Sequence, residues 1–237
     1  MLISNGVVKK ELSEFEKNIG VVFNNQDLLR QAFVHRSYLN EHKRFPLPHN
    51  ERIEFLGDAV LELAVTDFLF RKYPDKTEGD LTSYRSALVN TDMLANTGDE
   101  LGINDYLLLS KGEAKDTGRA RQYIIANAFE ALIGAIYLDQ GYEPARDFVA
   151  RTLFSHTEEI VEKRLWQDAK SRFQEKAQDV VGVTPSYKTL EERGPDHDKY
   201  FKIGVFLKTE KIAEGEGKSK QEAEQNAAAE GLKARGW

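Results

Sequence analysis

The sequence predicts two domains of different fold class, an all-α domain followed by a smaller α+β domain. Apolar residues recur with helical periodicity over residues 12–163, and no segment there alternates in the manner of a strand. Beyond that stretch the pattern changes to two helical segments that enclose three strand-like ones. We therefore expect residues 8–162 to form the helical domain, 163–167 a linker, and 168–237 the second domain.

The first domain is predicted to consist of helices joined by short breaks. The breaks fall at Phe45–Pro48, Pro74–Gly79 and Gly112–Gly118, where proline, glycine and polar residues favour turns. The periodic segments between the breaks are Phe15–Ile19, Leu28–Tyr38, Glu51–Tyr73, Leu81–Leu101, Arg121–Leu138 and Pro144–Val161.

The second domain is predicted to follow the order helix, three strands, helix. Asp168 is a candidate N-cap, because an aspartate side chain accepts hydrogen bonds from the free amides at the start of a helix. The strand-like segments are bounded by turn residues, and alanine is frequent in the final helix. In chain order the five segments are Asp168–Val181, Ser186–Glu192, Tyr200–Leu207, Lys211–Glu216 and Ser219–Ala234.

Composition narrows the classes of function that the chain can have. Of its 237 residues 41% are hydrophobic and 30% charged, and no apolar run approaches the roughly 20 residues that span a bilayer. Met1–Gly6 lack the basic and apolar regions of a signal peptide, and the chain contains no cysteine. We therefore expect a cytoplasmic protein with no membrane partner and no disulfide. The net charge of −6 argues against a simple polycationic nucleic-acid binder.

An acidic stripe interrupts an otherwise apolar helix. Glu51, Glu54 and Asp58 are spaced i, i+3 and i+7, which places them within roughly a 60° arc of one helix face. Three like charges this close repel one another unless a cation lies among them. The stripe therefore predicts a site for a hard metal ion. The opposite face is expected to pack against a core through Ile53, Leu56, Val60 and Leu63.

A second polar pair lies in an apolar helix further along the chain. Asn127 and Glu130 are spaced i, i+3 within Ile124–Tyr137 and therefore share one face. A charged glutamate in such surroundings is costly unless it is paired. Two interpretations are open: a polar contact to a neighbouring helix, or a position facing the acidic stripe across a shared cation.

Several segments together resemble the ribonuclease III family. The most specific is His49–Asp58, with the sequence HNERIEFLGD, and Ala32–Tyr38, Glu78–Thr82 and Ala126–Asp139 match further motifs in the family's order. Residues 168–237 resemble a double-stranded RNA-binding domain. The resemblance covers nearly the whole chain and implies an all-α endonuclease domain followed by an α-β-β-β-α RNA-binding domain.

By this resemblance, the two polar clusters form one magnesium site. Glu54, Asp58, Asn127 and Glu130 are the implied metal ligands, and Asp58 and Glu130 are the implied catalytic residues. Mn²⁺ is expected to substitute for Mg²⁺. Asn127 departs from the family, where aspartate is common at this position. Its amide oxygen can still ligate Mg²⁺ but carries no charge, so a tolerated variant and an inactivating substitution are both open.

Other residues of the first domain are implied to shape the substrate site and the dimer. Glu51 and Glu78 are expected to line the acidic valley on its RNA side, whereas Glu62 is expected to be solvated or to lie behind the metal ligands. Family members cut both strands of a duplex as homodimers, and Phe55 is implied to insert into the partner subunit. Without the resemblance, a core phenylalanine is equally expected at position 55.

The second domain is predicted to contact the grooves and phosphates of double-stranded RNA. Gln221 replaces a lysine that is common in the family, and Glu222 and Glu224 add negative charge, so binding by this domain alone is expected to be modest and salt-dependent. At the start of the last helix, backbone amides and two lysines are expected to converge on a phosphate. The predicted contacts are Gln174 and Gln178 in the first helix, His197 in a loop, and Lys218, Ser219 and Lys220 at the start of the last helix.

The resemblance thus implies a Mg²⁺-dependent endoribonuclease that leaves 5′-phosphate and 3′-hydroxyl ends with short 3′ overhangs. By resemblance, its roles are maturation of ribosomal RNA precursors and the processing or decay of messenger RNA. The alternative is a homologue that binds double-stranded RNA but is weakened by Asn127. A di-iron oxidoreductase is excluded, because it needs Glu-x-x-His motifs, whereas Ile133 follows Glu130 and Gly57 follows Glu54 at that spacing. No small-molecule cofactor is expected.

Overall fold

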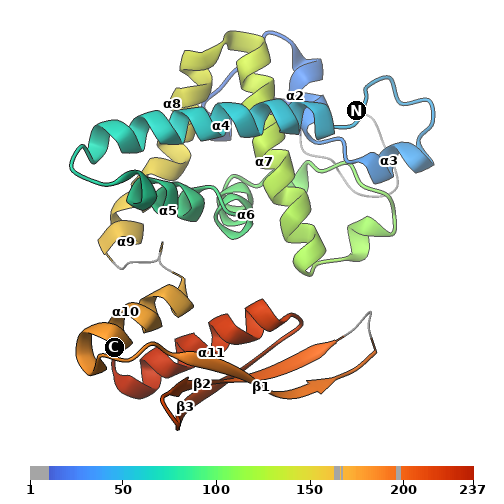
Figure 1. Cartoon of the computed structure of the whole chain (residues 1–237). Helices are drawn as coiled ribbons and strands as arrows, with labels where there is room; N and C mark the ends of the chain where they lie inside the picture. Colours follow the sequence, from blue (N-terminus) through green and yellow to red (C-terminus); the bar gives the residue numbers. More distant parts are fainter. Residues whose placement is uncertain (1–10, 163–165, 167, 196–198) are drawn as a thin grey trace. The chain divides into compact units, whose positions relative to one another are not determined.

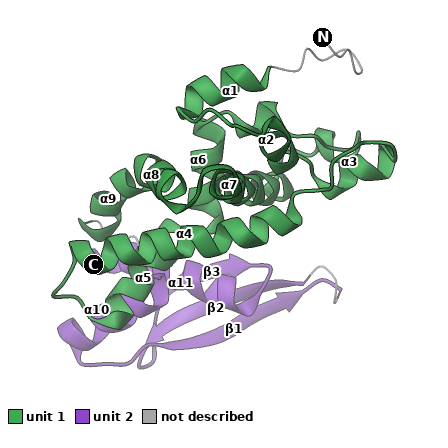
Figure 2. Cartoon of the chain, turned by 90° about the horizontal axis from the view of Figure 1, so that it is seen from above, with its two compact units in different colours: residues 1–164 green, residues 165–237 purple. Residues whose placement is uncertain are grey.

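The chain divides into two compact units in a computed structural model, which describes residues 11–162, 166, 168–195 and 199–237. The first unit comprises residues 1–164 and the second residues 165–237 (Figure 2). This division falls within the expected linker, most of which lies outside the described residues. The exact domain boundaries therefore stay a prediction.

The first unit is all-α, as the sequence predicts. Two 22-residue helices, α4 and α7, cross at its centre, and the other helices surround them (Figure 1). In chain order the helices are α1 (Leu12–Ile19), α2 (Gln26–Ala32), α3 (Arg36–Glu41), α4 (Glu51–Lys72), α5 (Glu78–Leu88), α6 (Thr91–Glu100), α7 (Arg119–Gln140), α8 (Tyr142–Leu153) and α9 (Thr157–Glu162), with the 3-10 turns η1 (Ile103–Asp105), η2 (Glu113–Lys115) and η3 (Phe154–His156).

Helix α7 forms the centre of this unit because apolar residues cover nearly its whole circumference. Phe129, Leu132 and Ile136 are fully buried, and α2, α4, α6 and α8 all pack against the helix. A helix that is apolar all round is stable in water only when its neighbours enclose it. No helix within the described residues is long and apolar enough to cross a membrane.

The expected single helix over Leu28–Tyr38 is wrong, because the structure places two helices there. Val34, between α2 and α3, forms an isolated β-bridge with Leu108. His35 then caps α3, since its ring nitrogen Nδ1 accepts a hydrogen bond from the backbone N–H of Ser37 at 3.3 Å. A long-range pairing, which periodicity does not reveal, interrupts the helical pattern.

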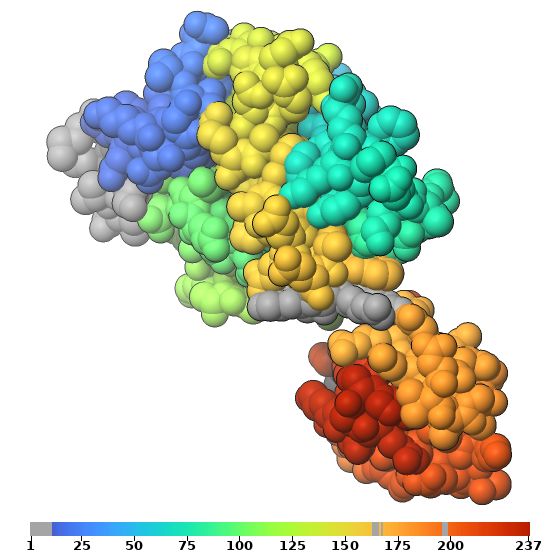
Figure 3. Space-filling view, turned by 90° about the vertical axis from the view of Figure 1, so that its left-hand side faces the viewer, coloured from blue at the N-terminus to red at the C-terminus, as the bar shows by residue number. Residues whose placement is uncertain are grey.

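Two further expected helices are also divided. Leu81–Leu101 separates into α5 and α6, because Asn90 caps α6 by accepting a hydrogen bond from the amide of Met93 at 2.9 Å. Pro144–Val161 separates into α8 and α9 at η3, a tightened turn of the kind common at helix ends. In the space-filling view, α8 and α9 adjoin the region of α4 and α5 (Figure 3), in agreement with the packing of α8 on α4 and α9 on α5.

The second unit has the predicted order helix, three strands, helix. The strands form one antiparallel sheet in the order β1-β2-β3, in which Ile203 of β2 pairs with Thr189 of β1 and Gly215 of β3. Asp168 is the N-cap, as expected, and accepts a hydrogen bond from the amide of Ser171 at 3.0 Å. The elements are α10 (Ala169–Val181), β1 (Ser186–Arg193), β2 (Tyr200–Leu207), β3 (Glu210–Gly217) and α11 (Lys220–Arg235).

Small residues let α11 approach the sheet closely. A Cβ atom added to Gly215 of β3 would lie 2.0 Å from the backbone nitrogen of Ala227. Alanine at positions 223, 227 and 228 of α11 is fully buried against the sheet, where a larger side chain would separate the layers. The core contains Phe173 of α10 and Val205 of β2, so both helices pack on one face of the sheet (Figure 1).

Candidate active site and nucleic-acid interface

The candidate active site begins with a close crossing of α4 and α7. A Cβ atom on Gly57 would lie 1.8 Å from the carbonyl oxygen of Glu130, and one on Gly134 would lie 2.3 Å from the carbonyl oxygen of Ile53. Only glycine permits backbones to approach this closely. The crossing therefore places the N-terminal half of α4, which carries the acidic stripe, directly against the middle of α7.

The acidic stripe lies on α4 as its spacing predicts. Glu51 and Asp58 are exposed, whereas Glu54 is half-buried. Burial raises the pKa of the Glu54 carboxyl, and the negative charges of Glu51 and Asp58 raise it further. Because the charged form of Glu54 is disfavoured by its neighbours, a bound cation at this position would relieve the repulsion.

Glu130 is the most strongly perturbed carboxyl of this cluster. Burial, as the largest cause, and the negative charges of Asp58, Glu54 and Glu62 together raise its pKa from 4.5 to about 8. The carboxyl of α7 is therefore electrostatically coupled to the stripe on α4. This supports the interpretation in which Glu130 faces the stripe, rather than one in which it makes an isolated polar contact.

Glu62 has a partner that sequence reasoning missed. Its carboxylate forms an ion pair with Arg85 Nε of α5 at 2.9 Å, and Arg85 Nη1 also donates a hydrogen bond to Thr66 Oγ1 at 2.9 Å. Arg85 is 23 positions away on another helix, and no sequence spacing connects it with Glu62. The pair gives Glu62 a cationic partner on α5, whereas no such partner is found for Glu54 or Asp58 among the ion pairs of the described residues.

The donor atoms of the cluster suit Mg²⁺. Asn127, half-buried, lies one turn before Glu130 on α7, so its amide is on the same side of the helix. Carboxylate and amide oxygens are the ligands that hard cations prefer, and Mg²⁺ retains several waters, so few protein ligands suffice. Within the described residues, no three His, Cys, Asp or Glu side chains are close enough together to enclose an ion as they stand.

Glu78 does not belong to the same electrostatic group. It begins α5, where its carboxylate Oε1 accepts a hydrogen bond from Thr82 Oγ1 at 3.0 Å. It is also absent from the charges that raise the pKa of Glu54 or Glu130. Within one chain, the structure therefore brings Glu51, but not Glu78, to the stripe.

An exposed apolar strip runs along the outer face of α4. Phe55 is 80% exposed, so the expectation of a core phenylalanine is wrong. Leu63, expected in the core, is 56% exposed, because Val60, Leu61 and Ala64 fill the buried side of the helix instead. Residues 55, 59 and 63 are spaced i, i+4 and i+8, so they share one face of α4 and form this apolar strip.

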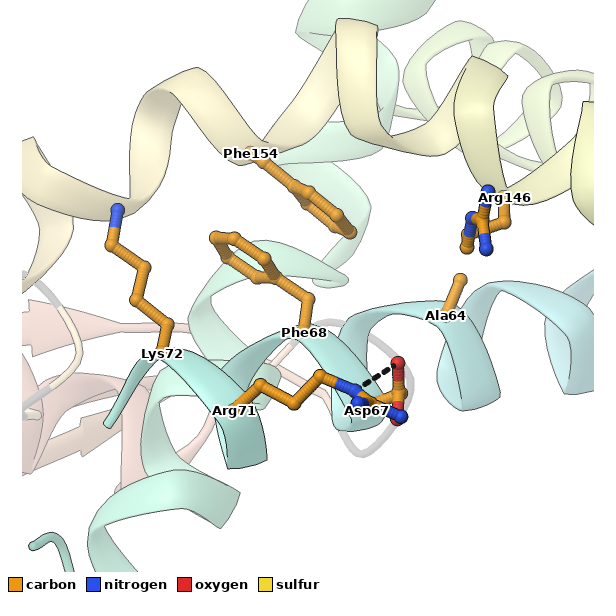
Figure 4. A pocket seen from close by; sticks show the side chains of 7 residues that line it. All are labelled: Ala64, Asp67, Phe68, Arg71, Lys72, Arg146 and Phe154. Carbon is orange, nitrogen blue, oxygen red and sulfur yellow. Dashed lines mark hydrogen bonds and ion pairs between the residues drawn. The ribbon is translucent and has the colours of Figure 1, made fainter. Parts of the chain in front are cut away.

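A cavity lies at the C-terminal end of α4. It measures about 370 Å³, and the rings of Phe68 and Phe154 stack across it with centroids 3.7 Å apart (Figure 4). The Asp67 carboxylate accepts hydrogen bonds from Arg71 Nε at 2.9 and 3.0 Å beside these rings. This cavity contains none of the predicted site residues and is separate from the carboxylate cluster.

The second unit presents part of the predicted RNA surface. Gln174 and Gln178 are both exposed on α10, and Gln178 Nε2 donates a hydrogen bond to Thr184 Oγ1 at 2.6 Å. This contact fixes the Gln178 side chain at the end of the helix. His197 lies outside the described residues.

The start of α11 differs from the expected phosphate site. The backbone amide of Lys218 donates to the Glu222 carboxylate at 2.9 Å, and the amide of Glu222 donates to Ser219 Oγ at 3.1 Å. These internal partners occupy amides that the sequence suggested for a phosphate. An anion could still be attracted by the positive charges of Lys218 and Lys220. The Lys220 ammonium lies 5.6 Å from the centroid of the Phe201 ring.

The two glutamates expected to weaken this surface are engaged within the domain. Glu222 is held by the amide of Lys218, and Glu224 Oε2 accepts a hydrogen bond from Lys170 Nζ at 2.6 Å. The Lys170–Glu224 pair also connects α10 with α11. Their charges therefore stabilise helix ends and helix packing in addition to lowering the local potential.

Together, these features define a class: a helical nuclease domain with a carboxylate cluster, joined to an α-β-β-β-α nucleic-acid-binding domain. The family profile described as Ribonuclease-III-like matches residues 25–157, and the double-stranded RNA binding motif matches residues 169–234. The chain belongs to the ribonuclease III family. Its activity is that of an endoribonuclease specific for double-stranded RNA.

Full-length relatives and solved structures agree with this assignment. The chain is 46% identical to Ribonuclease 3 of Bacillus velezensis over 223 residues, covering 94% of this chain and 89% of the relative. It is 44% identical to Ribonuclease 3 of Streptococcus agalactiae over 224 residues, covering 94% and 98%. The nuclease domain of ribonuclease III from Campylobacter jejuni superposes with a TM-score of 0.55 at 37% identity, covering 60% of this chain and 95% of that domain. That structure is described as showing flexibility in a region involved in dimer formation.

Proposed function

We propose that the chain hydrolyses both strands of double-stranded RNA in a Mg²⁺-dependent reaction at the α4–α7 crossing. Glu54 and Asp58 of α4, with Asn127 and Glu130 of α7, would hold the metal, and Mn²⁺ would substitute for it. The observation that carries the proposal is the raised pKa of Glu130, which Glu54 and Asp58 of the facing helix help to cause. A shared cation explains why one protein keeps these like charges together.

The residues of the cluster have distinct parts in this proposal. When bound, Mg²⁺ supplies Lewis acidity towards the phosphodiester and the attacking water. Asp58 and Glu130, the proposed catalytic residues, come from different helices and would hold the cation at the position where the reacting phosphate binds. Asn127 contributes a neutral oxygen, so the site carries one negative charge fewer than a site with aspartate there. The products are a 5′-phosphate and a 3′-hydroxyl.

A homodimer would supply the second site needed to cut the other strand. Phe55 and Leu63 form part of an exposed apolar strip on α4, and such a strip is a typical protein–protein contact surface. We propose that Phe55 inserts into the second copy, and that the two cuts leave short 3′ overhangs. Glu51, and Glu78 at the start of α5, would line the acidic valley on its RNA side.

The second domain would hold the duplex by its shape. Its proposed contacts are Gln174, Gln178, His197, Lys218, Ser219 and Lys220. Glutamine amides can hydrogen-bond in the minor groove of A-form RNA, and the lysines can contact phosphates. We place this activity in the cytoplasm, in keeping with a chain that lacks cysteine, and propose roles in ribosomal RNA maturation and in messenger RNA processing or decay.

Cleavage of a long RNA duplex in the presence of Mg²⁺ or Mn²⁺ tests this proposal. We expect the wild-type chain to cut it, and Glu130→Gln to lower kcat by roughly 100-fold or more, because a key group of the charged cluster is lost. Glu14→Gln, at an exposed position of α1, removes one carboxylate away from the site and should leave the rate unchanged. Equal rates for the two variants would contradict the proposed site.

Asn127 makes a weakened enzyme the second candidate. If the wild-type chain binds the duplex but does not cut it, and Asn127→Asp restores cutting, this second candidate is correct. If both forms cut the duplex at rates within a few-fold of each other, Asn127 is a tolerated ligand.

A further inference from the structure

Residues 36–49 form a surface segment that begins and ends beside the acidic stripe. Arg36 Nη1, at the start of α3, lies 3.6 Å from Glu51 Oε1, and His49 Nδ1 lies 3.7 Å from Glu51 Oε2. Helix α3 is accordingly next to the N-terminal end of α4 (Figure 1). Compact loops whose ends lie close together are often functional.

The far part of this segment is an ordered turn. The backbone N–H of Phe45 donates to the carbonyl oxygen of His42 at 3.0 Å, which places Lys43 and Arg44 at the two central positions. The ring of Tyr38 stacks on His42 with centroids 3.9 Å apart and meets the edge of Phe45 at 5.2 Å. Aromatic contacts thus hold both ends of the turn, and its two cations project from a preorganised backbone.

The positive charge of the turn is not compensated nearby. Lys43 and Arg44 are exposed, and neither forms an ion pair with any carboxylate of the described residues. The adjacent carboxylate, Glu41, instead accepts hydrogen bonds from the backbone N–H of Lys111 at 3.2 Å. Many other cations in this structure do have such partners, as Arg85 and Lys202 illustrate.

An RNA strand that approaches the carboxylate cluster faces electrostatic repulsion. Adjacent cations at the edge of the site would counter it by binding the phosphates that flank the reacting one, which also releases condensed counterions. Arginine and lysine are the usual phosphate-binding side chains, and their contacts position a substrate without reading its sequence.

We propose that the turn at Lys43–Arg44 is a phosphate-contact surface for the double-stranded RNA substrate, beside the acidic stripe. This inference rests on the proposed cleavage site at the α4–α7 crossing. Both residues are positioning residues: they fix the RNA backbone relative to the cluster and take no part in the chemistry.

The test compares two double variants that remove the same charge. Lys43→Gln/Arg44→Gln removes two cations from the turn, and Lys17→Gln/Arg30→Gln removes two exposed cations from α1 and α2. Steady-state cleavage of one RNA duplex with Mg²⁺ is measured for the full chain over a series of KCl concentrations. Binding is measured in the same series with Glu130→Gln added to each chain, so that the binding result does not depend on cleavage.

For the turn variant we expect KM to rise roughly tenfold at 0.1 M salt with kcat nearly unchanged, and the slope of log K against log[KCl] to fall by about two. The conservative variant Lys43→Arg/Arg44→Lys should retain the wild-type slope. The α1–α2 variant should match the wild type in both measurements. Equal slopes for the two charge-removing variants would overturn the proposal. If the wild type binds the duplex without cutting it, the proposed reaction is refuted. The comparison of slopes would then still test whether Lys43 and Arg44 contact phosphates.

Discussion

Each domain contains a strongly perturbed carboxyl, and the two have opposite surroundings. In the first, like charges converge at the α4–α7 crossing, and the pKa of Glu130 rises to about 8. In the second, Glu214 accepts hydrogen bonds from Lys202 and Lys211, which lower its pKa to about 2. A carboxyl whose charged form is destabilised by its surroundings indicates a functional site, because such a group lowers the stability of the fold. A carboxylate paired with lysines is typical of a structural role.

The largest effect should follow from breaking the crossing itself. Gly57→Ala places a Cβ atom against the Glu130 backbone, so α4 and α7 must separate. We expect a loss of about 3 kcal/mol or more of unfolding free energy in the first unit, and roughly a 100-fold fall in cleavage rate, because the two halves of the site move apart. Hydrogen exchange and cleavage assays measure the two effects.

Two other glycines serve as controls for this comparison. Gly215→Ala should destabilise the second unit in the same way, since its Cβ would lie 2.0 Å from the Ala227 nitrogen, but should spare kcat. Gly112→Ala, whose Cβ would have no neighbour closer than 3.8 Å, should change neither quantity. If Gly57→Ala resembled Gly112→Ala, the close approach of the helices would not matter.

A second effect is expected on the pH dependence of the unfolding free energy, in which Glu130 should differ from an ordinary carboxyl. In the unfolded chain this carboxyl ionises near 4.5, but in the folded protein only near 8, so the folded state binds the proton more tightly. Stability without metal therefore falls as the pH rises from about 4.5 to about 8. Glu130→Gln cannot ionise and should be more stable than the wild type above pH 8, by up to about 5 kcal/mol, since each pKa unit corresponds to about 1.4 kcal/mol.

Urea unfolding in a metal chelator across this pH range measures the difference. The gain should shrink as the pH falls towards 4.5. A gain that stays constant with pH would mean that it arises from packing and not from ionisation.

The smallest change in stability is expected for Glu214, whose pKa is lowered and not raised. Because its folded-state pKa is below the ordinary value of 4.5, it contributes stability that is present above pH 4.5 and is lost as the pH falls through about 2. Glu214→Gln should thus lower the Tm of the second unit slightly at pH 7. The difference should disappear towards pH 2, and a change of the opposite sign at pH 7 would show that its lysine contacts do not stabilise the sheet.

The sequence alone predicted the architecture and much of the site, for physical reasons. The spacing of Glu51, Glu54 and Asp58 determines their common face on any helix, and the alternation in β2 reflects one buried face of a sheet. The pairing of Glu62 with Arg85 was not predictable, because it depends on how two helices pack. The exposure of Leu63 was missed for a similar reason: an isolated helix does not show which of two apolar sides meets the core.

The capping network at Ser219 gives a more local lesson. The sequence suggested that the amides at the start of α11 were free for a phosphate, yet Glu222 and Ser219 occupy two of them. A serine followed three residues later by a glutamate is a common helix-start pattern. The same residues therefore supported two interpretations, and only the hydrogen bonds of the folded chain distinguished them.

The central claim is that Glu130 shares one cation with the stripe on α4. Mg²⁺ titration by calorimetry at pH 7, in two buffers of different ionisation enthalpy, tests it most directly, because it counts the protons released on binding. With a pKa near 8, Glu130 is mostly protonated at pH 7, so wild-type binding should release close to one proton per site, and Glu130→Gln should release almost none. Equal proton release by the two proteins would contradict the account.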